Sequence, residues 1–438
     1  MVKINKLIRS TSLILKGLNQ KPFASEFPAS ILSLDNGLTL IHQYLNFSPV
    51  AAVDVWVKAG AAREPESWSG IAHFLEHMIF KGTDRLPPGA FDRAIENRGG
   101  IANAATSYDY AHFFITTAAE YLENTLVPLS EILLRAAIPE DEFVRERDVV
   151  LEEIRQSEDD PDWLGFQSLL YAIYPRHPYG RSILGQLETL MEQSPEMMRR
   201  FHRCYYQPEN MTVAIVGNIS QEQALKMVTR QFRDFSPRLS CSPRTIEAEP
   251  PLIERRLQQL YLPRLETARL MMAWTGPGVE RLHDAYGLDL LAVLLTEGRT
   301  SRLVRELREE RHWVQSIDSN FSLGQDSSLF TITAWLEPEY LEAVEALICD
   351  RLWELRSEPI SESELLRCQR LLCNDYTFST ETATQLAGLY GYYHTIARAD
   401  LAVSYPFHIQ SFYPEDLQRV ADAYLSPSHY AVTTLEPL

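Results

Sequence analysis

The sequence is poor in basic residues, in cysteine and in long apolar runs. Its 438 residues include 41 Lys and Arg against 59 Asp and Glu, which gives a formal net charge of −18. This balance disfavours binding to nucleic acid, and it favours either solubility or the attraction of ligands of positive charge. The five cysteines form no C-x-x-C pair, so neither a disulfide framework nor a cysteine metal site is indicated, and we expect reduced thiols. No run of about 20 apolar residues occurs, so we expect no membrane span.

The N-terminal segment has a very short apolar core, Leu13 to Leu15. A secretory signal peptide needs about 7 to 15 apolar residues, so this segment does not fit one. The first 25 residues contain no acidic side chain, which leaves an organellar presequence as an alternative. We expect a cytoplasmic protein.

Two pairs of similar segments indicate an internal duplication. Residues 205–217 resemble residues 424–434, and residues 142–153 resemble residues 364–375, each pair being about 220 residues apart. Similarity of one pair arises easily by chance, but two pairs at nearly equal offsets are harder to dismiss.

Four prolines and a loss of periodicity mark residues 236–251 as a linker. We therefore predict an N-terminal domain at residues 1–235 and a C-terminal domain at residues 252–438. Within each half, alternation typical of strands is interleaved with apolar repeats typical of helices. The strand examples are Val53, Val55 and Val57, Phe113 and Ile115, and Phe330, Ile332 and Ala334, and the helical examples are residues 121–137 and 341–355. The predicted fold class is α+β, with two similar halves that each consist of a sheet covered by helices.

The motif His73-Phe-Leu-Glu-His77 carries the strongest chemical signal. In a helix, positions i, i+3 and i+4 share a face, so both imidazoles and the carboxylate of Glu76 project together. Two histidines one turn apart can bind one zinc ion, and a carboxylate beside them can act on a water molecule at the metal. The alternative is a core helix whose histidines make only structural hydrogen bonds.

Two histidines leave a catalytic zinc one protein ligand short, and a downstream acid would complete the set. A predicted helix at residues 142–157 offers four candidates, and spacing alone does not choose among them. They are Glu142, Glu146, Glu152 and Glu153. A charge-rich helix is also typical of a solvated surface, which is the alternative interpretation.

Over nearly its whole length the sequence resembles the pitrilysin-type zinc metallopeptidases of family M16. Within that family it resembles the group of mitochondrial processing peptidase β subunits and bacterial processing-peptidase-like proteins. His73-x-x-Glu76-His77 matches the inverted zinc motif of the family. The resemblance implies Glu153 as third ligand of one Zn²⁺ per chain, Glu76 as the catalytic residue, and Glu146 in a supporting role near the site. It also implies two similar α+β halves that form half of a clamshell chamber.

Residues 99–109 resemble a family segment that forms an edge strand and pairs with extended substrate. Asn103 and Ala104 lie in this segment, so the resemblance implies that they bind substrate. The segments at residues 177–185 and 205–217 also match the family.

The second half departs from the family where relatives carry an Arg and a Tyr, seven positions apart, that contact substrate. The Arg falls on Arg308, but Gln315 stands at the position of the Tyr and His312 at that of a Gly. The zinc motif is not repeated in this half, so we expect no second metal site. Its corresponding positions hold Asp289, Ala292 and Val293.

The sequence therefore predicts a zinc-dependent peptidase that hydrolyses extended peptides or unfolded segments, with basic peptides favoured by the net charge. The alternative is a non-catalytic structural subunit, which the missing tyrosine favours and the intact zinc motif disfavours. We expect a dimer, and we predict a related partner chain that supplies the Arg and Tyr pair. A homodimer in which Gln315 or His312 supplies the hydrogen-bond donor is the alternative.

Overall fold

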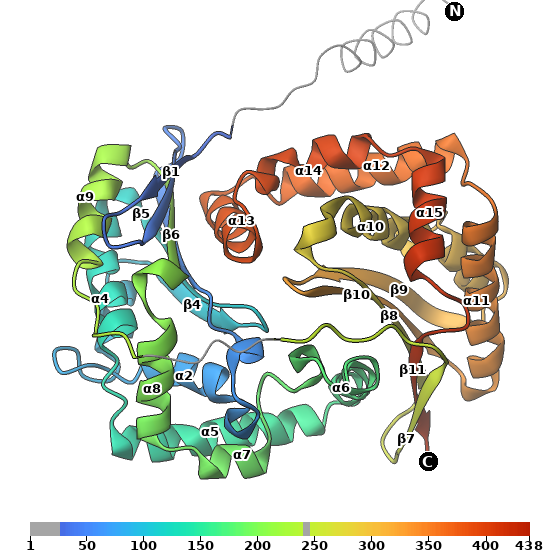
Figure 1. Ribbon diagram of the computed structural model, residues 1–438, viewed down its shortest axis with the longest axis horizontal. Coiled ribbons are helices and arrows are strands. Elements are labelled where there is room, and N and C mark those ends of the chain that lie inside the picture. The colour runs from blue at the N-terminus through green and yellow to red at the C-terminus, as the bar shows by residue number, and fades with distance from the viewer. Residues whose placement is uncertain (1–26, 240–245) are drawn as a thin grey trace, which may run out of the picture.

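The computed structural model describes residues 27–239 and 246–438. The N-terminal segment on which the prediction of the compartment rests lies outside these residues. The described chain forms two β-sheets, each with helices packed against it (Figure 1). The predicted α+β class with two similar halves is confirmed.

The first sheet has six strands, and its parallel pair, β2 and β6, lies among antiparallel neighbours. In spatial order the strands are β1 (Ser30–Ser33), β2 (Thr39–Tyr44), β6 (Met211–Gly217), β3 (Val50–Val57), β5 (Ala111–Ala118) and β4 (Ile101–Thr106). Val53, Val55 and Val57 of β3 lie in one hydrophobic core, as their alternation predicted. Within the part of the chain that the structure describes, β4 pairs only with β5, so the other edge of β4 has no partner strand there.

Helices cover the core face of this sheet and build the surface around it. They are α2 (Ile71–Ile79), α3 (Ala90–Glu96), α4 (Leu122–Arg135), α5 (Glu140–Glu158), α7 (Leu187–Glu192), α8 (Pro195–Tyr205) and α9 (Gln221–Gln231). Apolar side chains of α2, α4 and α5 join the valines of β3 in the core. This packing fixes α2 and α5 against each other, which matters for the site.

The second sheet repeats the strand order of the first without an equivalent of β1. Its strands are β7 (Arg256–Leu262), β11 (Ala431–Pro437), β8 (Ala268–Pro277), β10 (Ser327–Leu336) and β9 (Val314–Leu323), and β7 and β11 are parallel. Its helices are α10 (Leu282–Thr296), α11 (Leu341–Ser357), α12 (Glu362–Phe378), α14 (Leu401–Gln410) and α15 (Pro414–Tyr424). The edge strand β9 therefore corresponds to β4.

Two helices cross between the halves. Helix α6 (Pro161–Ile173) packs on the second sheet, where Leu169 lies in a cluster with Met271. Helix α13 (Ala383–Ile396) packs on the first sheet, where Tyr390 lies in a cluster with Val216. The sheets themselves lie on either side of residues 236–251, and the predicted domain bounds remain a proposal.

The cysteines follow the expectation in part. Cys349, Cys368 and Cys373 are free. Cys204 is disulfide-bonded, so the expectation of a reduced thiol is wrong for this residue, because spacing along the sequence does not reveal which thiols the fold brings together. Among the described residues, every helix is too short or too polar to cross a membrane.

Candidate metal centre

Helix α2 presents the predicted motif from a well-defined start. Gly70 precedes the helix with a φ of +89°, and a Cβ there would lie 2.6 Å from the carbonyl oxygen of Leu184. The carboxylate of Glu64 accepts hydrogen bonds from the backbone N–H groups of Gly70 at 2.9 Å and Ala72 at 2.7 Å. These bonds satisfy amides at the start of α2 that have no partner within the helix. Sequence reasoning missed Glu64, because nothing in its spacing marks it.

Three side chains converge between α2 and α5. Oε2 of Glu153 lies 3.7 Å from Nε2 of His73 and 3.6 Å from Nε2 of His77. All three potential ligand atoms lie within 4.8 Å of one another. Ligands about 2.1 Å from a tetrahedral zinc ion lie about 3.4 Å apart, so this donor set fits the ion that the resemblance implies.

The geometry separates Glu153 from the other acids of α5. Glu142 pairs with Arg145 at 2.7 Å, and Glu152 pairs with Arg155 at 3.1 Å. Glu153 instead faces the histidines, and Glu146, two turns earlier on the same face, reaches His77. The phase of α5 against α2 separates Glu152 from Glu153, whereas Glu142 differs from Glu153 by its position along the helix.

Glu146 connects the cluster to Lys81. Its Oε1 accepts a hydrogen bond from Nδ1 of His77 at 2.9 Å, and its Oε2 lies 2.6 Å from Nζ of Lys81. Burial alone would raise the pKa of Glu146, but the hydrogen bonds with His77 and Lys81 outweigh it and lower the pKa. The carboxylate is therefore ionised and leaves Nε2 of His77 facing Glu153.

The two histidines have different pKa values. Burial, helped by the charge of His77, lowers the pKa of His73 to about 3. Burial also opposes the charged form of His77, but its hydrogen bond to Glu146 and the charges of Glu153 and Glu146 raise its pKa. Because metals bind neutral imidazole, metal binding at His77 competes with a proton.

Glu76 lies beside the cluster at the edge strand. Its Oε2 accepts a hydrogen bond from Oγ1 of Thr106, at the end of β4, at 2.5 Å. Burial raises the pKa of Glu76, and this hydrogen bond and the charge of His77 offset the rise in part. The carboxyl group is thus held by a neutral donor and can accept a proton. Sequence reasoning missed Thr106 as the residue that holds it.

Asn103 and Ala104 lie on β4, which is the edge strand that the sequence predicts. Oδ1 of Asn103 accepts a hydrogen bond from the backbone N–H of Ala104 at 2.9 Å. The strand ends at Thr106, next to Glu76. An extended peptide can therefore add to the unpaired edge of β4 and run past Glu76.

Arg308 lies in the second half, in a π-helix at Val304–Glu310. Its guanidinium group pairs with Glu309 at 2.9 Å, and none of the described hydrogen bonds or ion pairs of Arg308 joins it to the histidine cluster. His312 has a φ of +57°, the left-handed conformation that suits glycine, and its Nδ1 lies 2.9 Å from the carbonyl oxygen of Arg308. Gln315 is exposed at a register shift between β9 and β10. π-Helices and bulges often occur at functional sites.

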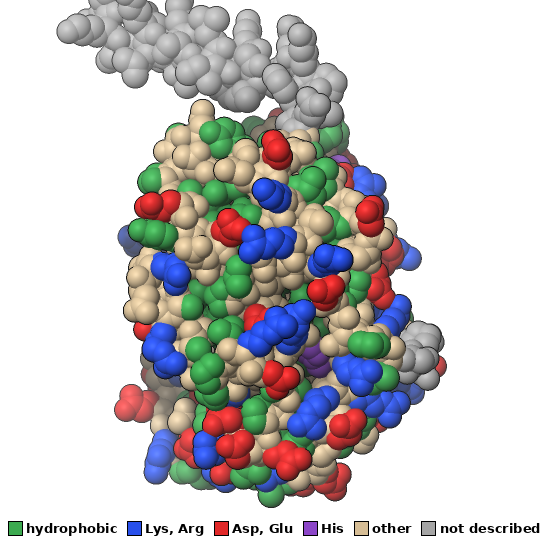
Figure 2. Space-filling model, turned by 90° about the vertical axis from the view of Figure 1, so that its left-hand side faces the viewer, with side chains coloured by type: hydrophobic (Ala, Val, Ile, Leu, Met, Phe, Trp, Pro, Cys, Tyr) green, Lys and Arg blue, Asp and Glu red, His purple; other side chains and the backbone are tan. Residues whose placement is uncertain are grey.

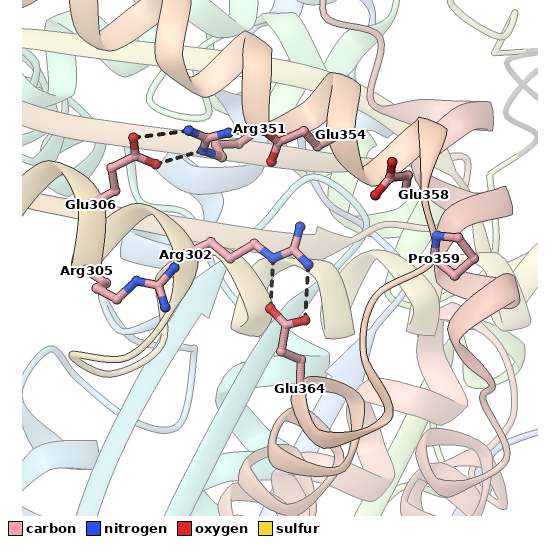
Figure 3. Close-up of a pocket in the computed structure, with 8 residues that line it drawn as sticks. All are labelled: Arg302, Arg305, Glu306, Arg351, Glu354, Glu358, Pro359 and Glu364. Atoms are coloured by element: carbon pink, nitrogen blue, oxygen red, sulfur yellow. Dashed lines mark hydrogen bonds and ion pairs between the residues drawn. The ribbon is translucent and has the colours of Figure 1, made fainter.

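A pocket of about 390 Å³ lies beside this π-helix (Figure 3). The described residues that line it include no group of three potential metal ligands. Its arginines already have carboxylate partners: Arg302 binds Glu364 at 2.9 and 3.1 Å, and Arg351 binds Glu306 at 2.7 and 3.1 Å. The pair with Glu306 fastens the π-helix to α11, and the pair with Arg302 fastens the chain just before the π-helix to α12. Among the described residues, the one group of three potential metal ligands is His73, His77 and Glu153.

Two family models match consecutive parts of the chain. The model described as insulinase (peptidase family M16) matches residues 40–187, and the model described as peptidase M16 inactive domain matches residues 194–372. The chain is 28% identical over 440 residues to the zinc protease PqqE of Helicobacter pylori, with 99% of each chain covered. It is 28% identical over 349 residues to the uncharacterized zinc protease YmxG of Bacillus subtilis, with 79% of this chain and 83% of the relative covered.

Solved structures agree with these matches. The crystal structure of a protease from Helicobacter pylori superposes with a TM-score of 0.89 at 28% identity and covers 94% of this chain and 100% of that one. A putative M16-like peptidase from Alicyclobacillus acidocaldarius gives a TM-score of 0.83 at 19% identity, covering 96% of this chain and 99% of that one, and shares the fold.

Proposed function

Because this chain belongs to peptidase family M16, we propose that it is a zinc-dependent peptidase that hydrolyses bonds in extended peptides or unfolded segments. One observation carries this proposal: the two Nε2 atoms of His73 and His77 face the same oxygen of Glu153 at 3.7 and 3.6 Å. Two imidazoles and a carboxylate are the ligand set of catalytic zinc in several peptidases.

His73, His77 and Glu153 would hold one zinc ion per chain. A zinc ion bound there supplies a Lewis acid that polarises the scissile carbonyl and lowers the pKa of water. The chain itself supplies the orientation of the ligands, because Glu146 fixes the ring of His77 and Lys81 fixes Glu146.

Glu76 acts as general base and then as general acid. It takes a proton from the attacking water and passes it to the leaving amine. Its burial and its hydrogen bond from Thr106 support this role, since both hold the carboxylate in one place beside the histidines.

The substrate binds as an added strand along β4, with Asn103 and Ala104 among the residues that it contacts. Main-chain hydrogen bonds give affinity, and alternate side chains enter pockets that set the sequence preference. Arg308, in the second half of the chain, also contacts substrate. The net charge of −18 supports a preference for basic peptides.

The protein works as a dimer that encloses its substrate, with a related chain as partner. The absence of a tyrosine at Gln315 supports this proposal, because a partner can supply the Arg and Tyr pair. The same absence favours one alternative function, a non-catalytic subunit of such an assembly.

Metal analysis together with a quenched-fluorescent peptide assay tests the function. We expect about one zinc per chain and hydrolysis that a chelator abolishes and added zinc restores. His77→Ala should lose both zinc and hydrolysis, whereas Glu142→Ala should keep both, because the carboxylate of Glu142 pairs with Arg145. A wild-type chain that binds no zinc, or that hydrolyses no peptide with any related partner chain, would contradict the proposal.

A further inference from the structure

The two hairpins that carry the edge strands meet at their tips. Asp109 lies in the turn between β4 and β5, and Gln325 lies in the turn between β9 and β10. Oδ2 of Asp109 accepts a hydrogen bond from the backbone N–H of Gln325 at 2.9 Å. This bond joins the first half of the chain to the second at the ends of its two edge strands.

Tyr179 completes the contact from a short turn after α6. Its hydroxyl lies 2.8 Å from both carboxylate oxygens of Asp109, to which it donates, and it accepts a hydrogen bond from the backbone N–H of Asp326 at 3.3 Å. A Cβ on Gly324 would lie 2.8 Å from this hydroxyl, so glycine allows the ring to approach. Tyr179 is 5% exposed and Asp109 is 8% exposed. One buried phenol thus bridges both hairpin tips.

Each hairpin tip also accepts a backbone hydrogen bond from a segment of its own half. The backbone N–H of Ala61 donates to the carbonyl of Ser107 at 3.0 Å, and the backbone N–H of Val279 donates to the carbonyl of Gln325 at 3.2 Å. The segments after β3 and β8 therefore play equivalent roles. The bridge through Tyr179 and Asp109 is an additional link, and it acts between the tips.

This bridge lies at the end of the proposed substrate strand. Asp109 follows Thr106, the last residue of β4, by three positions, and Thr106 bonds to Glu76. We propose that Asp109 and Tyr179 are positioning residues that hold the edge strand β4 in place relative to the second half. The consequence for catalysis rests on the proposed peptidase function, whereas the positioning itself does not.

Hydrogen–deuterium exchange of the full-length Tyr179→Phe variant tests the positioning. We expect backbone amides of residues 101–106 to exchange about tenfold faster, with α2 and α4 unchanged, because one buried hydrogen bond to this hairpin is lost. Tyr405→Phe is the matched control. Its hydroxyl donates to the Asp289 carboxylate within the second half, so its loss should leave residues 101–106 unchanged.

The kinetic consequence is a split between KM and kcat. For a peptide of about ten residues, Tyr179→Phe should raise KM about three- to tenfold and leave kcat within about twofold, with zinc content unchanged, because strand addition to β4 supplies binding. A role in stability alone would lower the melting temperature without this split. If Tyr179→Phe does not fold, Asp109→Asn gives the same readouts.

Two outcomes would overturn the positioning: unchanged exchange in residues 101–106, or a uniform loss of protection that includes α2 and α4. Faster exchange with an unchanged KM in an active enzyme would overturn its catalytic consequence. A wild-type chain without peptidase activity would instead refute the proposed function. The exchange of residues 101–106 would then decide the positioning by itself.

Discussion

Nδ1 of His77 donates a hydrogen bond to Oε1 of Glu146 at 2.9 Å. The bond fixes the tautomer and orientation of the ring, so that Nε2 faces Glu153 before any metal binds. We expect Glu146→Gln to lower zinc affinity about 10- to 100-fold, measured by competition with a chromogenic chelator. Glu142→Gln is the matched control, because Glu142 lies on the same helix and pairs with Arg145. Equal zinc affinity in Glu146→Gln and wild type would show that the contact does not orient the ligand.

Glu76→Gln should keep zinc and lose hydrolysis. The substitution removes the proton acceptor but leaves both imidazoles and Glu153, and loss of a general base costs about 10²- to 10⁴-fold in rate. Metal content and kcat, measured on the same preparation, check this expectation. If the variant lost zinc as readily as His77→Ala, Glu76 would be a ligand and the assigned role would be wrong.

The motif and the strands could be predicted because both depend on local periodicity. His73, Glu76 and His77 lie on one face of any helix that contains them, and the valines of β3 alternate in any strand. The choice of Glu153 over Glu152 depends on how α5 packs against α2, which is a contact between segments about 80 residues apart. From the residues alone four acids remained open, and the family resemblance was needed to choose one.

The sequence could not predict that helices α6 and α13 each pack on the sheet of the other half. The apolar residues of α6 and α13 show that each helix has a buried face, but not which sheet covers it. Leu169 packs on the second sheet and Tyr390 on the first, so the cores of the two halves interlock. Glu64 was missed for a similar reason: its bonds to Gly70 and Ala72 exist only because the chain turns back to the start of α2.

Asp289 should make stability depend on pH in the direction opposite to an ordinary paired carboxylate. Burial raises the pKa of Asp289 to about 6 in the folded chain, although a hydrogen bond from Tyr405 opposes the rise. The stabilising contribution is therefore complete below about pH 4 and is lost as the pH rises through about 6, by up to about 3 kcal/mol. Asp289→Asn should gain stability relative to wild type between pH 4 and pH 7 in urea unfolding.

Asp284 provides the control of opposite sign. Burial would raise the pKa of Asp284, but hydrogen bonds from Arg419 and Tyr424 outweigh it and lower the pKa. Asp284→Asn should therefore be less stable than wild type above about pH 4, and this difference should shrink as the pH falls below about 4. If the two variants show the same pH dependence, the assigned cause for Asp289 is wrong.

Basic peptides should be hydrolysed faster at low salt. Figure 2 shows Lys and Arg interspersed with Asp and Glu on one face of the molecule, so the charge of −18 is not gathered into one acidic surface there. An excess of acidic side chains near the site would attract cationic substrates, and salt would shorten the range of this attraction. We expect kcat/KM for a Lys-rich peptide to exceed that for a matched Glu-rich peptide, with the difference shrinking at high salt. Equal kcat/KM values for the two peptides at low salt would contradict this prediction.

The isolated chain should bind zinc and fold but hydrolyse peptides slowly. Gln315 stands at the position where the family resemblance implies a tyrosine that contacts substrate, and donors placed where oxyanion charge develops contribute about 10²- to 10³-fold in rate. A related chain that lacks the zinc motif but carries the Arg and Tyr pair should restore the rate. Full activity of the isolated chain, unchanged on adding that relative, would refute a requirement for a partner and leave the zinc assignment intact.

Gln315→Tyr tests the same idea within this chain. Gln315 is exposed where the pairing of β9 with β10 shifts register, so a larger side chain should be accommodated without repacking the core. If two copies of this chain can form the closed enzyme, the variant should gain up to about 10²-fold in kcat, whereas Asn320→Tyr, also exposed on β9, should gain nothing. A gain without the relative would mean that the missing hydroxyl, and not a missing partner, limits the wild-type chain. No gain in the isolated variant, together with activity on adding the relative, would mean that the second half of another protein is required.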